Sequence, residues 1–390
     1  MKKALILSPF FYPELISTGK YNTDIAQSLV DVGYEVTVLC SHPIYPMWVP
    51  CESCETLHGM TIIRGGKSNR YPSNPMLRRL VLETWFALFV FRKLRSFKTD
   101  FDVVIPILPP SLMGVSLGFF KHKIRRVVGI VHDLQAVHLS ASGGRFKKLI
   151  ATAINKVEKY SFDSCDSIIY LSGEMRTIAS EKFSIPLKKS HIVYPFVNIT
   201  DFLDNGRLDH IFDRSKKSVV YSGAIGDKQC PDALYELASR LVHERDDTLF
   251  YFFSGGPNFL RLKEKNRNPG IIFSNLVEKE AIGELLYRSD IQILPQAPGT
   301  AAASLPSKLP NILASGTRLF VITDVKSEIE MLLGNLESCV ISNTWDTSSN
   351  YIMLNSMLNE SVDKIVDSGL MSLFVKDRLV ELIDFQEKAP

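Results

Sequence analysis

Short apolar runs, typical of buried β-strands, alternate with helical patterns along almost the whole chain. The first such unit consists of an apolar run at Ala4–Leu7, a helical stretch at Thr18–Val32 and a second run at Glu35–Leu39. Strand, helix and strand in this order are typical of a parallel sheet covered by helices. A second series of the same kind begins at Ser218. We therefore predict an α/β protein with two doubly wound, Rossmann-like parallel-sheet domains that face each other across a cleft.

The chain length supports two domains, because 390 residues exceed what one hydrophobic core usually organises. We place the N-terminal Rossmann-like domain at residues 1–198 and the C-terminal one at residues 218–365. The charged, irregular segment 199–217 is expected to be a linker. The segment 366–390 is expected to form a C-terminal helix that can cross back to the N-terminal domain. Further strands are expected at Thr61–Ile63, Val103–Ile107, Val127–Val131, Ser167–Leu171, His191–Val193, Ser218–Gly223, Leu249–Phe253, Ile271–Phe273, Asp290–Leu294, Arg318–Ile322 and Cys339–Ile341.

The composition argues against several classes of protein. With 45 basic and 42 acidic residues, the chain lacks the charge excess expected of a nucleic-acid-binding protein. Its six cysteines suit a reducing compartment better than a disulfide framework, and the lone CxxC of Cys51 and Cys54 lacks the second ligand pair of a structural zinc site. The apolar run before Pro9 is too short for a signal peptide, and no run reaches the ~20 apolar residues of a membrane-spanning helix. A cytoplasmic location is therefore expected.

The stretch Gln296–Gly316 carries the strongest local signal for a ligand. A loop of small residues follows a predicted strand and leads to a helix start near Ser307 and Lys308, with Gly316 as the stop. The unpaired N–H groups at a helix start suit an anion such as a diphosphate. Lys308 in the first turn opposes the helix dipole, which a bound anion would explain. A plain strand–loop–helix connection is the alternative.

Two more glycine-bearing loops follow strands of the second series, one from Gly223 to Lys228 and one at Ser254–Pro257. Parallel strands place such loops on one edge of the sheet. Gly223, Gly255 and Gly256 allow a close backbone approach, and Lys228 can pair with phosphate oxygens. Together the loops favour a phosphate-bearing ligand.

In the first series, the long loop Ser8–Lys20 lies where ligands bind in open α/β sheets and contains Thr18 and Gly19. It is neither the GxGxxG of dinucleotide dehydrogenases nor a P-loop. Gly19 either lets a ligand approach the backbone or simply starts the helix.

Several segments in a fixed order identify a family resemblance. They are the opening SPFFYPELISTGKYNTDIAQSLVDVGYEVTVLCSHPIYP, VHDL at Val131–Leu134, YSGAIGDKQ at Tyr221–Gln229, FSGGP at Phe253–Pro257, and IIFSNLVEKEAIGELLYRSDIQILP followed by PSKLPNILASG. With these segments the chain resembles the family-4 retaining glycosyltransferases of the two-Rossmann (GT-B) type. It most resembles the O-antigen, capsule and colanic-acid branch, which includes N-acetyl-L-fucosamine transferases.

The resemblance implies an enzyme that transfers a sugar, such as L-FucNAc, with retention of the anomeric configuration. The expected donor is a UDP-linked sugar, and the expected acceptor is a lipid-linked saccharide in bacterial surface-polysaccharide synthesis. It implies no metal or other cofactor, because cations and N–H groups stabilise the departing diphosphate. Two alternatives stay open: a non-catalytic nucleotide-sugar-binding partner subunit on the same fold, and a nucleotide-sugar epimerase.

Site residues follow from the resemblance by position. His132 and Asp133 are implied beside the transferred sugar, and Lys228 is implied as the lysine that neutralises the diphosphate. The implied donor-binding positions are Thr18, Gly19, Gly223, Gly255, Gly256, Leu276, Val277, Ser307, Lys308 and Asn311.

The chain also departs from the family pattern. Ala303 and Asn311 stand where many members carry two glutamates spaced E-x7-E, and Ala224 stands near the usual arginine. Asn311 can still bind a ribose hydroxyl, but without a charge-assisted hydrogen bond. Either reduced activity or altered specificity would follow.

An apolar run at Leu80–Phe91 is flanked by cations, and a second basic cluster follows it. This pattern suits peripheral contact with an anionic membrane, on the inner face of the cell membrane, where a lipid-linked acceptor would dock. A core helix with a solvated basic rim is the alternative. The expected membrane and acceptor surface comprises Arg78, Arg79, Arg92, Lys93, Arg95, Lys123 and Arg125.

Overall fold

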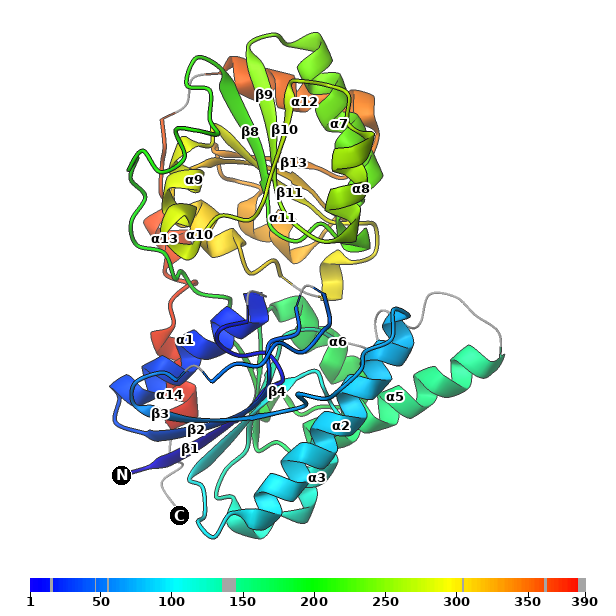
Figure 1. The fold of residues 1–390 in the computed structure, drawn as a ribbon, viewed down its shortest axis with the longest axis vertical. Helices are drawn as coiled ribbons and strands as arrows, with labels where there is room; N and C mark the ends of the chain where they lie inside the picture. The colour runs from blue at the N-terminus through cyan, green and yellow to red at the C-terminus, as the bar shows by residue number, and fades with distance from the viewer. Residues whose placement is uncertain are drawn as a thin grey trace. The chain divides into compact units, whose positions relative to one another are not determined.

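A computed structural model describes residues 1–14, 17–45, 47–54, 56–134, 145–303, 305–360 and 363–384. The chain divides into two units, one of Met1–Tyr194 with Lys376–Pro390 and one of Pro195–Val375. Each unit is a parallel sheet covered by helices (Figure 1). The prediction of an α/β protein with two doubly wound domains is confirmed.

The sheet of the first unit has seven strands in the order β3-β2-β1-β4-β5-β6-β7. The strands are β1 Lys3–Leu7, β2 Glu35–Ser41, β3 Met60–Gly65, β4 Val103–Leu108, β5 Val128–Val131, β6 Ser167–Tyr170 and β7 Ser190–Ile192. The main helices are α1 Ser17–Asp31, α2 Pro75–Ser96, α3 Met113–Phe119, α5 Arg145–Asp163, α6 Gly173–Phe183 and α14 Asp377–Asp384. Helix α3 packs against both α2 and α5, and α1 packs against α14 (Figure 1). The central strands are buried on both faces, as their uninterrupted apolar sequences predict.

Helix α14, near the C-terminus, packs in the first unit. Its Asp384 carboxylate pairs with the Lys2 ammonium at 2.6 Å and accepts a hydrogen bond from the Tyr34 hydroxyl, also at 2.6 Å. The return to the first unit begins at Lys376. The short helix α13, Ser368–Met371, belongs instead to the second unit, where it packs against α10, Leu309–Ala314.

The sheet of the second unit has six strands in the order β10-β9-β8-β11-β12-β13. The strands are β8 Lys217–Ser222, β9 Thr248–Phe253, β10 Ile271–Ser274, β11 Ile291–Pro295, β12 Arg318–Ile322 and β13 Cys339–Ser342. The helices besides α10 and α13 are α7 Pro231–Glu244, α8 Pro257–Lys265, α9 Ile282–Arg288, α11 Glu328–Leu333 and α12 Thr347–Asn359. Alternation along β9 sends Phe250 and Phe252 into one core cluster and Tyr251 and Phe253 into the other, so both faces are packed.

The segment 199–217, expected to be a linker, is part of the second unit. Its Leu208 and Phe212 are buried, and the Phe212 ring stacks on Tyr251 with the ring centroids 4.5 Å apart. The buried Glu284 carboxylate accepts hydrogen bonds from the N–H groups of Arg207 and Leu208, both at 3.1 Å. Two apolar residues spaced i and i+4 therefore fold the segment onto the sheet despite its many charges. The division between the units falls at Tyr194 and Pro195, just before the expected end at residue 198.

Candidate functional site

The strand order of the second sheet reverses between β8 and β11. In open α/β sheets, ligands bind beyond the carboxyl ends of the strands at this switch point. The loops that follow β8 and β11 meet there, since the N–H of Ala297 donates to the carbonyl oxygen of Lys228 at 2.7 Å. The structure thus brings together Lys228 and the loop that begins at Gln296.

The glycines of this edge leave open space above the backbone. Gly223 and Gly256 have φ angles of +123° and +91°, in the region that favours glycine. A Cβ atom added at Gly223, Gly255 or Gly256 would meet no atom within 4 Å. The loops after β8 and β9 are joined by a hydrogen bond from the Gly223 N–H to the Phe253 carbonyl oxygen at 2.9 Å. The edge therefore has room for a ligand to lie against the backbone.

Lys308 lies immediately before α10, and its side chain folds back under the β8 loop. Its Nζ donates to the Ser222 carbonyl oxygen at 2.9 Å and lies 4.4 Å from the centroid of the Tyr221 ring. Burial lowers the pKa of Lys308 to about 7. An anion placed beside this ammonium would favour its charged form. The helix begins at Leu309, one residue later than expected, and spans six residues.

The β11 loop is held in place by the strands and loops next to it. The Asp324 carboxylate, just after β12, accepts from the Gly299 N–H at 2.9 Å. The Trp345 ring nitrogen donates to the Gln296 carbonyl oxygen at 3.0 Å, and the Thr323 hydroxyl donates to the Gln296 side chain at 2.7 Å. Asp324 was not predicted from the sequence as a residue of this site. Its position just after the predicted strand Arg318–Ile322 could have indicated it.

The side chain of Asn311, expected to contact the ribose, makes hydrogen bonds with Asn198 in the structure. Its Oδ1 accepts from the Asn198 N–H and its Nδ2 donates to the Asn198 Oδ1, both at 3.0 Å. The shorter amide side chain, which replaces a glutamate of the family pattern, thus tethers the segment that enters the second unit. The Ala303 side chain lies outside the described part of the chain.

The other expected donor positions of the second unit differ in exposure. Ser307 is exposed in the turn before α10. Leu276 is 44 % exposed, whereas Val277 packs against the core cluster that contains Ala281 and Leu285. Leu276 is therefore accessible to a ligand, and Val277 mainly supports its loop.

In the first sheet the strand order reverses between β1 and β4, and the loop after β1 is fixed from several sides. The two oxygens of the buried Glu14 accept from the N–H groups of Ile44 at 2.9 Å and Tyr45 at 2.7 Å. Burial raises the pKa of Glu14, and these hydrogen bonds oppose the rise. A Cβ at Gly19 would lie 3.0 Å from the Glu14 Cβ, so Gly19 allows this close packing. Thr18 lies half-buried in the first turn of α1 beside it.

His132 follows β5 and lies against α1. Its N–H donates to the Leu108 carbonyl oxygen at 2.8 Å, and its ring centroid lies 5.0 Å from that of Tyr21 in an edge arrangement. The Nε2 atom is buried and has no hydrogen-bond partner among the described residues. Burial lowers the pKa of His132 to about 4, against the opposing charge of Asp133, so the imidazole is neutral at pH 7. A neutral ring with an unused nitrogen can bind a hydroxyl group of a ligand.

The apolar residues of helix α2 are divided between a buried face and an exposed face. One face carries the buried Leu82, Phe86 and Val90, while Leu80 and Leu88 on another face are 59 % and 56 % exposed. The cations around it divide in the same way. Arg92, Arg95 and Arg125 are exposed, and Arg79 is half-buried. The other three cations contact neighbouring groups. The Arg78 guanidinium covers the Trp48 ring, the Lys93 Nζ lies 5.9 Å from the Phe89 ring centroid, and the Lys123 Nζ donates to the Phe97 carbonyl oxygen. In the part of the chain that the structure describes, no helix is long and apolar enough to cross a membrane.

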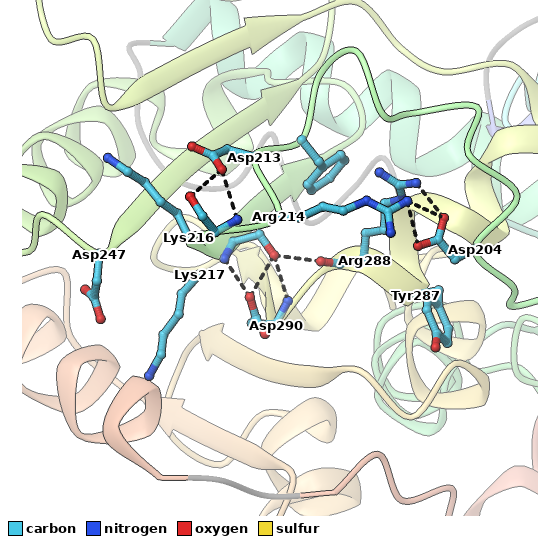
Figure 2. Close-up of a pocket in the computed structure, with 12 residues that line it drawn as sticks. Asp204, Asp213, Arg214, Lys216, Lys217, Asp247, Tyr287, Arg288 and Asp290 are labelled. Atoms are coloured by element: carbon cyan, nitrogen blue, oxygen red, sulfur yellow. Dashed lines mark hydrogen bonds and ion pairs between the residues drawn. The ribbon is translucent and has the colours of Figure 1, made fainter.

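A pocket of about 520 Å³ lies at the opposite edge of the second sheet, at the amino ends of β8 and β11 (Figure 2). Asp290 accepts from the Ser218 N–H at 2.6 Å, and Arg288 pairs with Asp204 at 2.5 Å and Glu284 at 2.9 Å. These groups anchor the segment 199–217 to the sheet, and their charges are largely paired. The charged groups that line the pocket therefore have a structural role. The pocket also lies at the amino ends of the strands, whereas ligands of doubly wound sheets bind at the carboxyl ends.

The comparisons with known proteins agree with this geometry. Residues 18–201 match the model of Glycosyltransferase Family 4. A protein of Escherichia coli strain K12 named as a colanic acid biosynthesis glycosyl transferase, WcaI, is 27 % identical over 361 residues, which cover 85 % of each chain. These matches support a family-4 glycosyltransferase.

Solved structures establish the GT-B fold of the chain. WaaG, a glycosyltransferase involved in lipopolysaccharide biosynthesis, superposes with a TM-score of 0.67 at 13 % identity, over 98 % of this chain and all of its own. An apo structure of OtsA gives 0.65 at 9 % identity, with both chains fully covered. The UDP-GlcNAc 2-epimerase of Methanocaldococcus jannaschii gives 0.56 at 11 % identity, over 98 % of this chain and 99 % of its own.

Proposed function

We propose that this glycosyltransferase transfers a sugar, with retention, from a UDP-linked donor to a lipid-linked saccharide in bacterial surface-polysaccharide synthesis. The observation that carries the proposal is the meeting of Lys228, the open glycine loops and the half-buried Lys308 at the carboxyl edge of the second sheet. The likeness to WcaI supports polysaccharide synthesis as the setting. An N-acetylated deoxyhexosamine such as L-FucNAc is the proposed sugar.

In the proposed reaction, the bond between the sugar and the diphosphate breaks and negative charge develops on the diphosphate. Lys228 and Lys308 stabilise that charge where it develops, without help from a metal ion. The acceptor oxygen forms the new bond to the anomeric carbon on the same face of the sugar, and the leaving phosphate accepts the proton of that hydroxyl, so a separate general base is not needed. His132 offers its unused ring nitrogen to a hydroxyl of the sugar, and Asp133 lies beside it.

The second candidate is a partner subunit that binds a nucleotide sugar without turnover. Two observations favour it: the amide of Asn311 is engaged by Asn198, and Ala224 stands where the family usually has an arginine. Both changes remove groups that would otherwise hold the donor.

Incubation of the purified chain with radiolabelled UDP-sugars and a polyprenyl-diphosphate-linked saccharide tests these alternatives. Transfer, or slow hydrolysis of the donor without an acceptor, supports the proposal. Binding of the donor with no turnover would identify the partner subunit, and an isomerised donor would identify an epimerase. The anomeric configuration of the product, read by NMR, tests retention.

We also propose that the exposed face of α2 docks on an anionic membrane through Arg92, Lys93 and Arg95. The exposed Leu80 and Leu88 beside exposed arginines form an amphipathic surface of the kind that binds at a bilayer interface.

A further inference from the structure

The pocket at the amino ends of β8 and β11 is lined by as many acidic as basic side chains (Figure 2). The acidic residues are Asp204, Asp213, Asp247 and Asp290, and the basic residues are Arg214, Lys216, Lys217 and Arg288. The formal charges of the lining cancel, so they select neither an anion nor a cation. Helix α9 ends at Arg288, which places the negative end of its dipole at this edge of the sheet. A phosphate-bearing ligand is therefore disfavoured here, in contrast to the carboxyl edge.

Beyond the contacts that hold the fold, two carboxylates of the lining keep one oxygen each for a ligand. The Asp213 Oδ1 accepts from the Ser215 N–H at 2.9 Å and from the Ser215 hydroxyl at 2.6 Å. The Asp290 Oδ2 accepts from the Ser218 N–H at 2.6 Å and from the Ser218 hydroxyl at 2.9 Å. Among the described residues, nothing donates to the second oxygen of either carboxylate. These two oxygens can accept hydrogen bonds from ligand hydroxyl groups.

The same pocket contains donors that the described residues leave unused. The Lys216 ammonium is exposed and forms no hydrogen bond or ion pair with them. The Arg288 side chain is only 6 % exposed, and its Nη2 alone pairs with the carboxylates of Asp204, Asp209 and Glu284. Its Nε and Nη1 are buried and have no hydrogen-bond partner in the described part of the chain. Because a buried donor without an acceptor costs about 1–3 kcal/mol, a ligand oxygen that pairs with this guanidinium would be stabilised.

Tyr287 of α9 adds an aromatic surface to the pocket. It is 43 % exposed, whereas Phe212, the other aromatic residue of the lining, is buried against Tyr251. An exposed tyrosine offers an apolar ring face together with a polar hydroxyl. A ligand that complements the pocket must therefore be uncharged, carry groups that both donate and accept hydrogen bonds, and present C–H groups to a ring. Saccharides meet these three conditions, since each hydroxyl is both a donor and an acceptor.

We propose that this pocket binds a neutral oligosaccharide, at a site separate from the site of sugar transfer. Its hydroxyl groups donate to Asp213 and Asp290 and accept from Lys216 and Arg288, and one sugar ring lies against Tyr287. The volume of about 520 Å³ is within the range of small-molecule sites, about 300–1,000 Å³. The inference goes beyond the proposed function, because it assigns a second saccharide site at the opposite edge of the sheet. It rests on the proposed function only for the source of the oligosaccharide, which is the glycan chain that the enzyme extends.

Saturation-transfer NMR titrations with neutral trisaccharides of glucose, galactose, fucose and N-acetylglucosamine, without any donor, test the inference. At least one trisaccharide should bind at least about 10-fold more tightly than its constituent monosaccharides, because it engages more of the lining groups; this equals about 1.4 kcal/mol. Asp213→Asn with Lys216→Gln, and separately Tyr287→Ala, should each weaken this binding about 10-fold. All three positions are exposed, so the fold should survive, which circular dichroism checks. The matched control, Lys263→Gln with Glu264→Gln at exposed positions of α8, should bind like wild type.

Four outcomes would overturn the inference: no binding of any trisaccharide, a trisaccharide that binds no more tightly than its monosaccharides, wild-type binding by both pocket variants, or binding of inorganic diphosphate that the same variants lose. The last would mean that the pocket is an anion site. Hydrolysis of UDP-sugars reports on the proposed function separately, and the pocket variants should hydrolyse them like wild type. A wild-type chain that binds the trisaccharide but never hydrolyses or transfers a donor would contradict the proposed function alone, so the two failures can be told apart.

Discussion

The ammonium group of Lys308 lies 2.9 Å from the carbonyl oxygen of Ser222, at the carboxyl end of β8. Lys308, which was predicted to lie at a helix start, thus directs its side chain to the end of β8, next to the loop that contains Gly223 and Lys228. The two lysines of the proposed diphosphate site come from the loops of β8 and β11, on either side of the switch point of the second sheet.

The first prediction concerns pH. The pKa of Lys308 is about 7 in the folded chain, well below the ordinary value of about 10.4. Between these values the unfolded chain binds more protons, so this group makes the free energy of unfolding rise with pH across that window. A diphosphate requires the charged form, so the affinity for UDP should fall as the pH rises above about 7. Calorimetric titration at several pH values measures this, and Lys308→Met should abolish most of the slope. A wild-type affinity that does not change with pH would exclude a role for this ammonium in binding.

The second prediction concerns turnover. Lys228→Ala or Lys308→Ala should lower the rate of donor hydrolysis or transfer more than about 10-fold, equivalent to about 1.4 kcal/mol of barrier. The physical reason is the loss of a cation at the place where the diphosphate charge develops. Lys263→Ala, at an exposed position of α8, is the matched control and should be unaffected. Rates like those of wild type in both lysine variants would remove these residues from the mechanism.

The third prediction separates a structural from a ligand-binding role of Asn311. Because its amide is engaged by Asn198, Asn311→Ala should lower the free energy of unfolding by about 1–3 kcal/mol. Asn198→Ala should lose a similar amount, and the double variant should lose less than the sum of the two. Urea denaturation measures all three. A stability that does not change, together with a raised KM for the donor, would restore the ribose contact suggested by the family pattern.

The fourth prediction concerns the membrane. Replacing Arg92, Lys93 and Arg95 together by glutamine should reduce sedimentation with phosphatidylglycerol vesicles, because each cation near an anionic surface contributes about 1 kcal/mol. The matched control replaces Lys263, Lys265 and Arg267 by glutamine on the second unit. Equal sedimentation of wild type and both triple variants would count against docking through α2.

The fifth prediction concerns metal ions. If the two lysines and the backbone supply the charge that a metal would otherwise provide, treatment with EDTA should leave transfer unchanged within about 2-fold. Restoration of a lost rate by added Mg²⁺ or Mn²⁺ would show that the proposed chemistry is incomplete.

The alternating apolar runs predicted the sheets well, because parallel strands buried on both faces are continuous runs such as Ile291–Pro295. The segment 199–217 was predicted as a linker, and its packing in the second unit was missed, since Leu208 and Phe212 are sparse among charges and the partner of Phe212, Tyr251, is remote in sequence. The meeting of the β8 and β11 loops was predicted because it follows from topology alone. The roles of Asn311 and Glu14 were not, since each depends on which backbone groups lie nearby in the folded chain.

A crystal structure of the chain with UDP tests the central proposal most directly. We predict that the diphosphate lies beyond the carboxyl ends of β8 and β11, with its oxygens about 3 Å from the side-chain nitrogens of Lys228 and Lys308. A diphosphate in the pocket of Figure 2, at the amino ends of the same strands, or no bound nucleotide at saturating concentration, would contradict it.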